Sequence, residues 1–286
     1  MLPLTELIQL TYEEDIPGGD ITSELTVPVD TPADARIITK AEGVFFGTSV
    51  IRECIRHVDP TIHCSLDVAD GDRITPNTRL MTLHGRMRSL LKFERVALNF
   101  LQRLCGVASS TRAYVDALGN ANIQVLDTRK TTPLLRELEK QAIVAGGGAN
   151  HRFGLSDMVL IKENHLLSMQ TAGCLHELES RLIDFKSRHP NIPIEIEIET
   201  LSQIDQLPLH HADIVMFDNF PFELISVGAE RLSRRAPTAK IEISGNITLD
   251  TISRYRHSPI HRISVGSLTH SVKALDLSMR LSSTGV

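Results

Sequence analysis

From Asn122 onward, short apolar strand patterns alternate with helix patterns, and this alternation limits the chain to few folds. The candidate strands are Ile123–Asp127, Met158–Ile161, Ile194–Ile198, Ile214–Phe217, Ile241–Ser244 and Ile263–Val265. The candidate helices are Leu134–Val144, Leu166–Arg188, Leu201–Leu207, Pro221–Arg234, Leu249–Tyr255 and Ser271–Leu281. Repeated strand–helix units predict parallel strands joined by right-handed crossovers.

Polar residues lie at the C-terminal end of every candidate strand, and this favours a barrel over an open sheet. They are Arg129-Lys130, Lys162, Glu197 and Glu199, Asp218-Asn219, Ser244-Gly245 and Gly266-Ser267. An open sheet gathers its site at one switch point, whereas a barrel builds it from the carboxyl ends of many strands. No G-x-G-x-x-G follows the first strand, so the dinucleotide-binding fingerprint is missing. We therefore predict an α/β barrel with fewer than eight strands.

The first third of the chain has a different pattern. Short strand candidates joined by turns predict a small, mainly antiparallel sheet, and they are Arg36–Gly47, Thr61–Val68 and Arg79–Leu83. Helix patterns cover Leu4–Glu14, Ser49–His57 and the long stretch Ser89–Leu118. We expect Gly106 to interrupt or kink the long helix. The sequence thus predicts an α+β unit ahead of the α/β repeats.

Charge and cysteine usage exclude several classes of protein. The net charge is −5 and the pI is about 6.2, and no basic run or basic face with interleaved aromatics indicates nucleic-acid binding. The four cysteines are scattered without zinc-like spacing, which is typical of a reducing compartment, so we expect a cytoplasmic protein. No apolar run approaches the roughly 18–20 residues of a membrane helix, and the N-terminus lacks signal-peptide features.

Cations gather at the ends of the first two predicted parallel strands and in the loop between them. Arg129 and Lys130 follow the first strand, His151 and Arg152 lie in the loop, and Lys162 follows the second strand. Arginine offers a planar fork to carboxylate or phosphate, and lysine offers a compact charge. So many cations in one concave site would repel each other unless anions fill it. The pattern predicts a substrate with several negative charges.

Acidic residues gather at the neighbouring strand ends. Glu195, Glu197 and Glu199 alternate with isoleucines, so the three face one side of their strand, and Asp218 ends the next strand. Hard oxygen ligands beside a polyphosphate suit Mg²⁺ better than zinc. Glycines after the last strands, in Ser244-Gly245-Asn246 and Gly266-Ser267, let backbone amides approach a phosphate.

Each of these features alone has a simpler structural explanation. A single arginine at a strand end is usually solvated or paired on the surface, and the three glutamates are compatible with one face of an edge strand. Gly146–Gly148 is typical of a helix C-cap. Together, however, these explanations require the same coincidence at six strand ends. The combined pattern favours a functional site.

Motifs along nearly the whole chain resemble those of the quinolinate phosphoribosyltransferase family, the decarboxylating enzymes also called nicotinate-nucleotide pyrophosphorylases (carboxylating). They are EDIPGGDITS (Glu14–Ser23), LNFLQRLCGVAS (Leu98–Ser109), DTRKTTP (Asp127–Pro133), GGGANHRFGLSD (Gly146–Asp157), LIKENH (Leu160–His165), EIEIE (Glu195–Glu199), FDN (Phe217–Asn219), ISGNI (Ile243–Ile247) and SVGSLTHS (Ser264–Ser271).

The resemblance implies a fold and an activity. The fold is an open-faced β-sandwich domain, residues 1–106, then an incomplete α/β barrel, residues 107–286, whose C-terminal helix packs back on the first domain. The substrates are quinolinate and phosphoribosyl pyrophosphate with Mg²⁺, and the products are nicotinate mononucleotide, pyrophosphate and CO₂, as in NAD biosynthesis. The assembly is a homodimer, or a higher oligomer built from dimers, with shared active sites. No nucleic acid or membrane takes part.

The resemblance also implies roles for single residues. Arg129, His151, Arg152 and Lys162 belong to the quinolinate site, joined by Arg103, and Thr128 also contacts substrate. Lys130 serves the pyrophosphate side, with Lys162 as a second candidate. Glu197 and Asp218 hold the ribose hydroxyls and Mg²⁺, either directly or through ribose or water. The 5′-phosphate falls to Ser244, Gly245, Asn246 and Gly266. Lys130, Lys162, Glu197 and Asp218 form the catalytic set.

The chain departs from the family pattern at three positions. Leu134 stands where the family often has Gly, Gln141 where it often has Tyr, and Val144 where it often has Arg. None of the three has an assigned chemical role. Two alternatives stay open: a same-fold homologue of the molybdenum-operon type that acts on another substrate, and a non-catalytic anion-binding protein. The intact DTRK, NHR and IKENH segments disfavour both.

Overall fold

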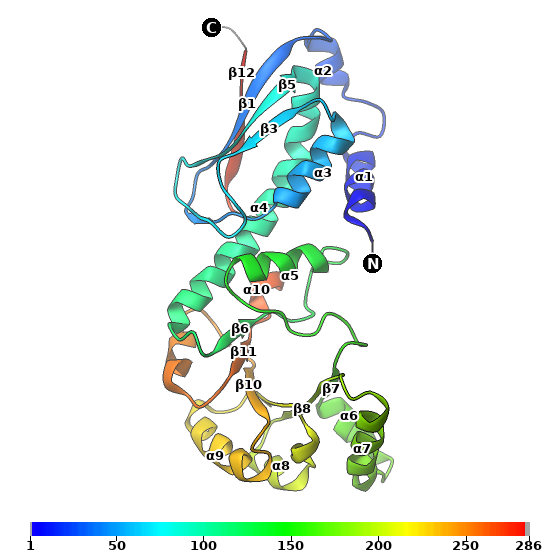
Figure 1. Ribbon diagram of the computed structural model, residues 1–286, viewed down its shortest axis with the longest axis vertical. Coiled ribbons are helices and arrows are strands. Elements are labelled where there is room, and N and C mark those ends of the chain that lie inside the picture. Colours follow the sequence, from blue (N-terminus) through cyan, green and yellow to red (C-terminus); the bar gives the residue numbers. More distant parts are fainter. Residues whose placement is uncertain (1, 284–286) are drawn as a thin grey trace. The chain divides into compact units, whose positions relative to one another are not determined.

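The computed structural model describes residues 2–283, which form two compact units. The sheet unit comprises residues 2–112, 131–147 and 268–283, and the barrel unit comprises residues 113–130 and 148–267. Each unit is therefore built from segments distant in the sequence. Figure 1 shows the elements of both units. No helix among residues 2–283 is long and apolar enough to cross a membrane.

The sheet unit contains a four-stranded antiparallel sheet in the order β12-β1-β5-β3. Its strands are β12 (Leu277–Ser283), β1 (Pro32–Thr39), β5 (Arg79–Arg86) and β3 (His63–Leu66), and a separate pair is β2 (Gly43–Val44) with β4 (Arg73–Ile74). The helices are α1 (Leu4–Asp15), α2 (Ile21–Thr26), α3 (Thr48–Val58), α4 (Met87–Leu118), which continues into the barrel unit, α5 (Arg136–Ala145) and α10 (Ser267–His270).

Strand β1 shows why this sheet is open on one face. Ala33, Ala35 and Ile37 alternate along the strand and are buried, whereas Arg36, on the opposite face, is exposed. The same alternation on neighbouring strands gives the sheet one apolar and one polar face. The predicted small sheet domain is confirmed.

The predicted helix over Ser271–Leu281 is wrong, because the chain forms α10 and then strand β12. The segment LSMRLSS alternates apolar and polar residues, which favours a strand, and β12 pairs antiparallel with β1, with Leu281 opposite Ala35. The C-terminal segment thus returns to the first sheet as a strand.

Gly106 does not interrupt α4, which runs without a break from Met87 to Leu118. A Cβ atom at Gly106 would lie 2.5 Å from the backbone oxygen of Lys273. The residue therefore lacks a side chain so that the returning chain can pack directly on the helix. The expected interruption at this glycine is therefore wrong.

The barrel unit contains six parallel strands in the order β6-β11-β10-β9-β8-β7. They are β6 (Gln124–Leu126), β11 (Arg262–Ser264), β10 (Lys240–Ser244), β9 (Ile214–Asp218), β8 (Ile194–Ile198) and β7 (Val159–Ile161). Strands β6 and β7 each pair with one named neighbour, so the ladder does not close. The prediction of an incomplete α/β barrel is confirmed.

Helices and short 3₁₀ turns connect the strands (Figure 1). The helices are α6 (Glu163–Thr171), α7 (Leu178–Arg188), α8 (Leu201–Gln206) and α9 (Ile225–Arg235). The 3₁₀ turns are η1 (Leu175–Glu177), η2 (Leu209–His211), η3 (Phe222–Leu224) and η4 (Ile252–His257). The single helix predicted over Leu166–Arg188 is split into α6 and α7, because a turn at Gly173 separates them.

Leu134 has a left-handed backbone with φ of 65°, in the turn before α5. This conformation costs a non-glycine residue about 1–2 kcal/mol, which explains why glycine suits the position. We expect Leu134→Gly to stabilise the protein by about 0.5–1 kcal/mol, because the relieved strain exceeds the entropy that glycine adds to the unfolded chain. The leucine side chain is 70% exposed, so little packing is lost.

Thermal and urea unfolding of the variant check this prediction. Leu155→Gly is the matched control, because Leu155 is a loop leucine of 73% exposure that lies outside the positive-φ set. The Leu155→Gly substitution should lower the stability of the protein or leave it unchanged. A Leu134→Gly protein less stable than wild type would contradict the strain argument.

Candidate active site

The barrel strands bring most of the predicted site residues to one edge of the sheet. In parallel strands all carboxyl ends lie at the same edge. The residues at or just beyond these ends are Thr128, Arg129, Lys130, Lys162, Glu197, Asp218, Ser244, Gly245, Asn246 and Gly266. His151 and Arg152 lie in the loop between α5 and β7. This edge of the barrel unit is the candidate active site.

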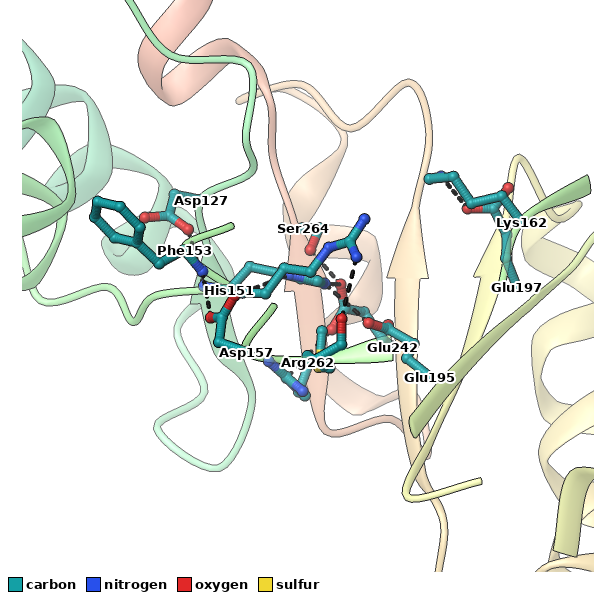
Figure 2. A network of polar contacts seen from close by, with 12 residues as sticks. Asp127, His151, Phe153, Asp157, Lys162, Glu195, Glu197, Glu242, Arg262 and Ser264 are labelled. Atoms are coloured by element: carbon teal, nitrogen blue, oxygen red, sulfur yellow. Dashed lines mark hydrogen bonds and ion pairs between the residues drawn. The ribbon is translucent and has the colours of Figure 1, made fainter. Parts of the chain in front are cut away.

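An ion pair joins Lys162 and Glu197 across neighbouring strands β7 and β8 (Figure 2). The Lys162 side chain is 42% exposed, whereas that of Glu197 is 2% exposed. Burial, followed by a hydrogen bond with Glu163, raises the pKa of Glu197 to about 7, against the opposing effect of Lys162. The negative charge of Asp218 also raises it, so two carboxylates lie close enough to repel each other.

Two arginines repel each other: Arg129 follows β6, and Arg152 contacts the residue directly before β7. Burial, followed by the positive charge of Arg129, lowers the pKa of Arg152, while Glu195 and Asp157 act in the opposite direction. The Arg152 guanidinium also donates a hydrogen bond to the Met158 carbonyl at 3.1 Å. An anion that binds between the two guanidinium groups offsets the repulsion that acts on Arg152.

His151 belongs to a polar cluster in the barrel interior (Figure 2). Its Nε2 lies 3.0 Å from Glu195 Oε2 and 3.4 Å from Glu242 Oε1, and its side chain is 6% exposed. Its backbone N–H donates to Asp127 Oδ1 at 2.8 Å. Burial lowers the pKa of His151, but hydrogen bonds with the two glutamates outweigh that effect and raise it. The ring therefore lies in the protein interior.

The turns after β9 and β10 are bonded to each other. The Asn246 side chain donates to Asn219 Oδ1 at 3.0 Å, and the Asn219 N–H donates to the Ser244 carbonyl at 2.9 Å. Gly245 has φ of 94°, and a Cβ atom there would lie 2.2 Å from Asn219 Oδ1. Only glycine fits this position, so the two turns form one fixed backbone segment beside Asp218.

His165 explains part of the LIKENH motif. Its Nδ1 accepts a hydrogen bond from the Lys162 backbone N–H at 2.9 Å, and its own N–H donates to the Lys162 carbonyl at 2.9 Å. These reciprocal bonds fix the start of α6 directly after Lys162. The histidine thus fixes the backbone that carries the lysine.

Arg103 lies on α4 in the sheet unit, where it contacts a buried glutamate. Its guanidinium donates to Glu139 Oε1 at 2.8 Å and to Thr132 Oγ1 at 3.0 Å, and a further contact joins it to the Thr269 carbonyl. The Glu139 side chain is fully buried, and that of Arg103 is 27% exposed.

Family models match both parts of the chain. The N-terminal domain of quinolinate phosphoribosyl transferase matches residues 20–105, and its C-terminal domain matches residues 107–280. The chain belongs to the quinolinate phosphoribosyltransferase family. The sequence resemblance is thus confirmed, and the family's two domains follow one another in this chain.

Relatives of this family match almost end to end. A probable nicotinate-nucleotide pyrophosphorylase (carboxylating) of Bacillus subtilis (strain 168) is 40% identical, over 97% of this chain and 93% of that protein. The Mycobacterium leprae (strain TN) nicotinate-nucleotide pyrophosphorylase (carboxylating) is 34% identical, over 96% of each. The solved structure of NadC from Streptococcus pyogenes superposes with a TM-score of 0.89 at 37% identity, covering 99% of this chain and 98% of that one.

Sequence reasoning missed part of the polar interior of this quinolinate phosphoribosyltransferase fold. Glu242 and Arg262 pair at 3.2 Å, and Ser264 also hydrogen-bonds Glu242, on strands β10 and β11. The segment KIEIS places Glu242 between isoleucines, the same alternation that drew attention to Glu195 and Glu197. That signal was available, but the apolar runs around it indicated an ordinary buried strand.

Proposed function

We propose that this chain transfers the phosphoribosyl group of phosphoribosyl pyrophosphate to quinolinate and removes one carboxylate, giving nicotinate mononucleotide, pyrophosphate and CO₂ for NAD biosynthesis. The observation that carries the proposal is the division of charge along one barrel edge. The repelling guanidinium groups belong to Arg129, after β6, and Arg152, before β7, and the lysine–carboxylate set of Lys162, Glu197 and Asp218 lies at the ends of β7, β8 and β9. Family membership supports the same reaction.

The arginines suit a dicarboxylate. Each guanidinium presents a planar fork of donors that matches a carboxylate, and quinolinate carries two adjacent carboxylates on its pyridine ring. An anion bound at Arg129 and Arg152 relieves their mutual repulsion. We assign quinolinate to this part of the site, with Thr128 and His151 as further members of it.

The acids suit ribose hydroxyls and Mg²⁺. Glu197 and Asp218 offer hard oxygen donors, and their mutual repulsion favours a bound cation. Mg²⁺ held there, directly or through ribose or water, would neutralise charge on the pyrophosphate. Lys130 and Lys162 supply further positive charge on that side. The fixed turn at Ser244, Gly245 and Asn246, with Gly266, takes the 5′-phosphate.

The reaction needs positioning and electrostatics more than a strong base. The pyridine nitrogen of quinolinate attacks C1 of the ribose, and the bond from C1 to the pyrophosphate oxygen breaks with its electron pair on the leaving group. Lys130 and Lys162 stabilise that negative charge, and the arginines hold the nitrogen in line. The ring nitrogen is then cationic. It stabilises the electron pair left on the adjacent carbon when CO₂ departs, and a proton adds there.

We also propose that Arg103 completes the quinolinate site of a second subunit in a homodimer. Arg103 lies on α4, outside the strand ends that form the edge. An arginine among apolar helix residues is costly to bury without an anion. In the single chain Glu139 is that anion. In the dimer, quinolinate bound in the partner's site would be a second anion that pairs with Arg103.

Quinolinate affinity distinguishes this function from the two alternatives. Calorimetry should show that quinolinate binds at least about tenfold more tightly than nicotinate, which lacks the second carboxylate. Equal affinities would favour a homologue with another substrate. Tight binding of quinolinate without turnover would favour a non-catalytic anion-binding protein.

Glu197→Gln should weaken Mg²⁺ and phosphoribosyl pyrophosphate binding more than quinolinate binding. The pKa of Glu197 is raised to about 7, so its negative charge appears as pH rises through neutrality. In wild type the Mg²⁺ dissociation constant measured with phosphoribosyl pyrophosphate should fall about tenfold from pH 6 to pH 8, the change in the ionised fraction. The variant should lose this pH dependence.

Glu199→Gln is the matched control for this experiment. Glu199 follows β8 on the same side as Glu197 but is exposed beyond the strand end. Its variant should keep the wild-type pH dependence. Equal weakening of both substrates by Glu197→Gln would show that the sugar-side assignment is wrong.

A further inference from the structure

Two glutamates of the barrel interior have no role in the proposed reaction, although charged side chains are costly to bury. Glu195 on β8 and Glu242 on β10 are both fully buried, and both face His151 Nε2, at 3.0 and 3.4 Å. On strand β11, Arg262 lies 3.2 Å from Glu242 Oε2, and Ser264 hydrogen-bonds Glu242 Oε1. Figure 2 shows this cluster as a group separate from the Lys162–Glu197 pair.

The contacts of the His151 ring fix its tautomer. Nδ1 accepts a hydrogen bond from the Arg152 backbone N–H at 2.7 Å. An acceptor nitrogen carries no proton, so the proton of the neutral ring is on Nε2, which lies 3.0 Å from Glu195 Oε2 and 3.4 Å from Glu242 Oε1. The two carboxylates also favour a second ring proton, but that proton would occupy Nδ1 and displace the Arg152 amide. The hydrogen bond from the Arg152 amide to Nδ1 requires the Nε2–H ring.

The loop that carries Arg152 is therefore held from the barrel interior. Asp127, directly after β6, accepts the His151 backbone N–H at 2.8 Å, and the His151 ring accepts the next backbone N–H, that of Arg152. Two successive amides of this loop are bonded to buried groups. These two hydrogen bonds fix the backbone that carries the Arg152 side chain.

A metal ion is a poorer explanation of the cluster. The ligand atoms of His151, Glu195 and Glu242 lie within 4.8 Å of one another, as three metal ligands can. However, both Glu242 oxygens already have protein partners, and one is the guanidinium of Arg262. The positive charge of the Arg262 guanidinium would repel a divalent metal ion bound beside it. The contacts fit hydrogen bonds and ion pairs within the protein.

We propose that Glu195 and Glu242 are positioning residues for substrate binding: they hold His151 as the Nε2–H tautomer, so that its Nδ1 fixes the backbone of Arg152. The role in binding rests on the proposed function, in which Arg152 contacts quinolinate. Arg262 and Ser264 orient Glu242 for this purpose. The class of ligand affected is the dicarboxylate, and the phosphoribosyl side is unaffected.

Steady-state kinetics of Glu195→Gln and Glu242→Gln test the proposal. Each variant should raise KM for quinolinate at least tenfold, while kcat and KM for phosphoribosyl pyrophosphate change less than threefold. Glu199→Gln is the control and should resemble wild type, because Glu199 is exposed just after β8, the strand that contains Glu195. Unchanged quinolinate KM in both folded variants would overturn the proposal. If they do not fold, Ser264→Ala replaces them, with an expected rise of about threefold.

A double-mutant cycle separates positioning from a general loss of structure. In His151→Asn the side-chain Oδ1 can accept the Arg152 amide without help from a glutamate. Adding Glu195→Gln to His151→Asn should therefore raise the quinolinate KM by less than twofold further, against at least tenfold in the wild-type background. An undiminished effect in the double variant would show that Glu195 does not act through His151.

The tautomer is measured without substrate, so its result is independent of the proposed function. Nitrogen-15 NMR of histidine-labelled protein at pH 10, above the His151 pKa of about 9, with His151→Asn to assign the signal, should show a neutral ring with the proton on Nε2. Glu195→Gln should change this spectrum. A doubly protonated ring or the Nδ1–H tautomer in wild type would overturn the positioning proposal. If wild type shows the expected tautomer but does not turn over quinolinate, the proposed function alone fails.

Discussion

Lys162→Ala is expected to lower kcat at least about 100-fold while leaving the fold intact. Removal of one positively charged group that stabilises a developing anion typically costs this much. The Lys162 side chain is 42% exposed at the strand end, so its loss leaves no large cavity. It does leave the buried Glu197 carboxylate without its cation, so the pKa of Glu197 should rise further. Turnover at saturating substrates and circular dichroism of the variant measure the two effects.

Lys240→Ala is the matched control for this prediction. Lys240 is an exposed lysine that begins strand β10, at the opposite end of the barrel strands. Its variant should retain wild-type turnover. A Lys162→Ala protein with wild-type kcat would remove Lys162 from the catalytic set.

A mixture of Arg103→Ala and Lys162→Ala proteins should recover activity that neither variant has alone. If Arg103 enters the partner's site, each mixed dimer contains one site with both wild-type residues. Random exchange makes about half of the dimers mixed, and half of their sites are intact, so the expected activity is about one quarter of wild type. The assay follows nicotinate mononucleotide after subunit exchange, which native mass spectrometry can confirm.

The Arg103–Glu139 pair requires a control for stability. Arg103→Ala leaves the fully buried Glu139 without its ion-pair partner, which typically destabilises a protein by about 3–5 kcal/mol. The double variant Arg103→Ala/Glu139→Gln removes both charges and should fold better. If either folded form exchanges subunits with Lys162→Ala and no activity returns, the shared-site proposal is wrong.

The barrel was predictable because its signals are local. Each parallel strand is a short apolar run, and each run ends at a polar group that the fold places on one edge. Lys162 and Asp218 were found in this way from the sequence alone. The strand pattern shows that both residues lie at strand ends, and the carboxyl ends of parallel strands share one edge of the sheet. Neither step requires knowledge of contacts between distant residues.

Other features depend on contacts between distant segments. Strand β12 was expected to be a helix, because nothing near it in the sequence reveals that β1 offers an edge for pairing. Alternation placed Glu195, Glu197 and Glu199 on one side of β8, but only burial separates the two interior glutamates from the exposed Glu199. The contact between Glu195 and His151 joins positions 44 apart, 195 minus 151, beyond the reach of periodicity.

Product formation is the most direct test of the proposed reaction. Purified protein is incubated with phosphoribosyl pyrophosphate, Mg²⁺ and quinolinate labelled in the carboxylate next to the ring nitrogen, with Lys162→Ala as the blank. We expect nicotinate mononucleotide and labelled CO₂ in equal amounts, and neither without phosphoribosyl pyrophosphate. Folded protein that binds both substrates but forms no nicotinate mononucleotide, or a nucleotide product that keeps the label, would contradict the proposed reaction.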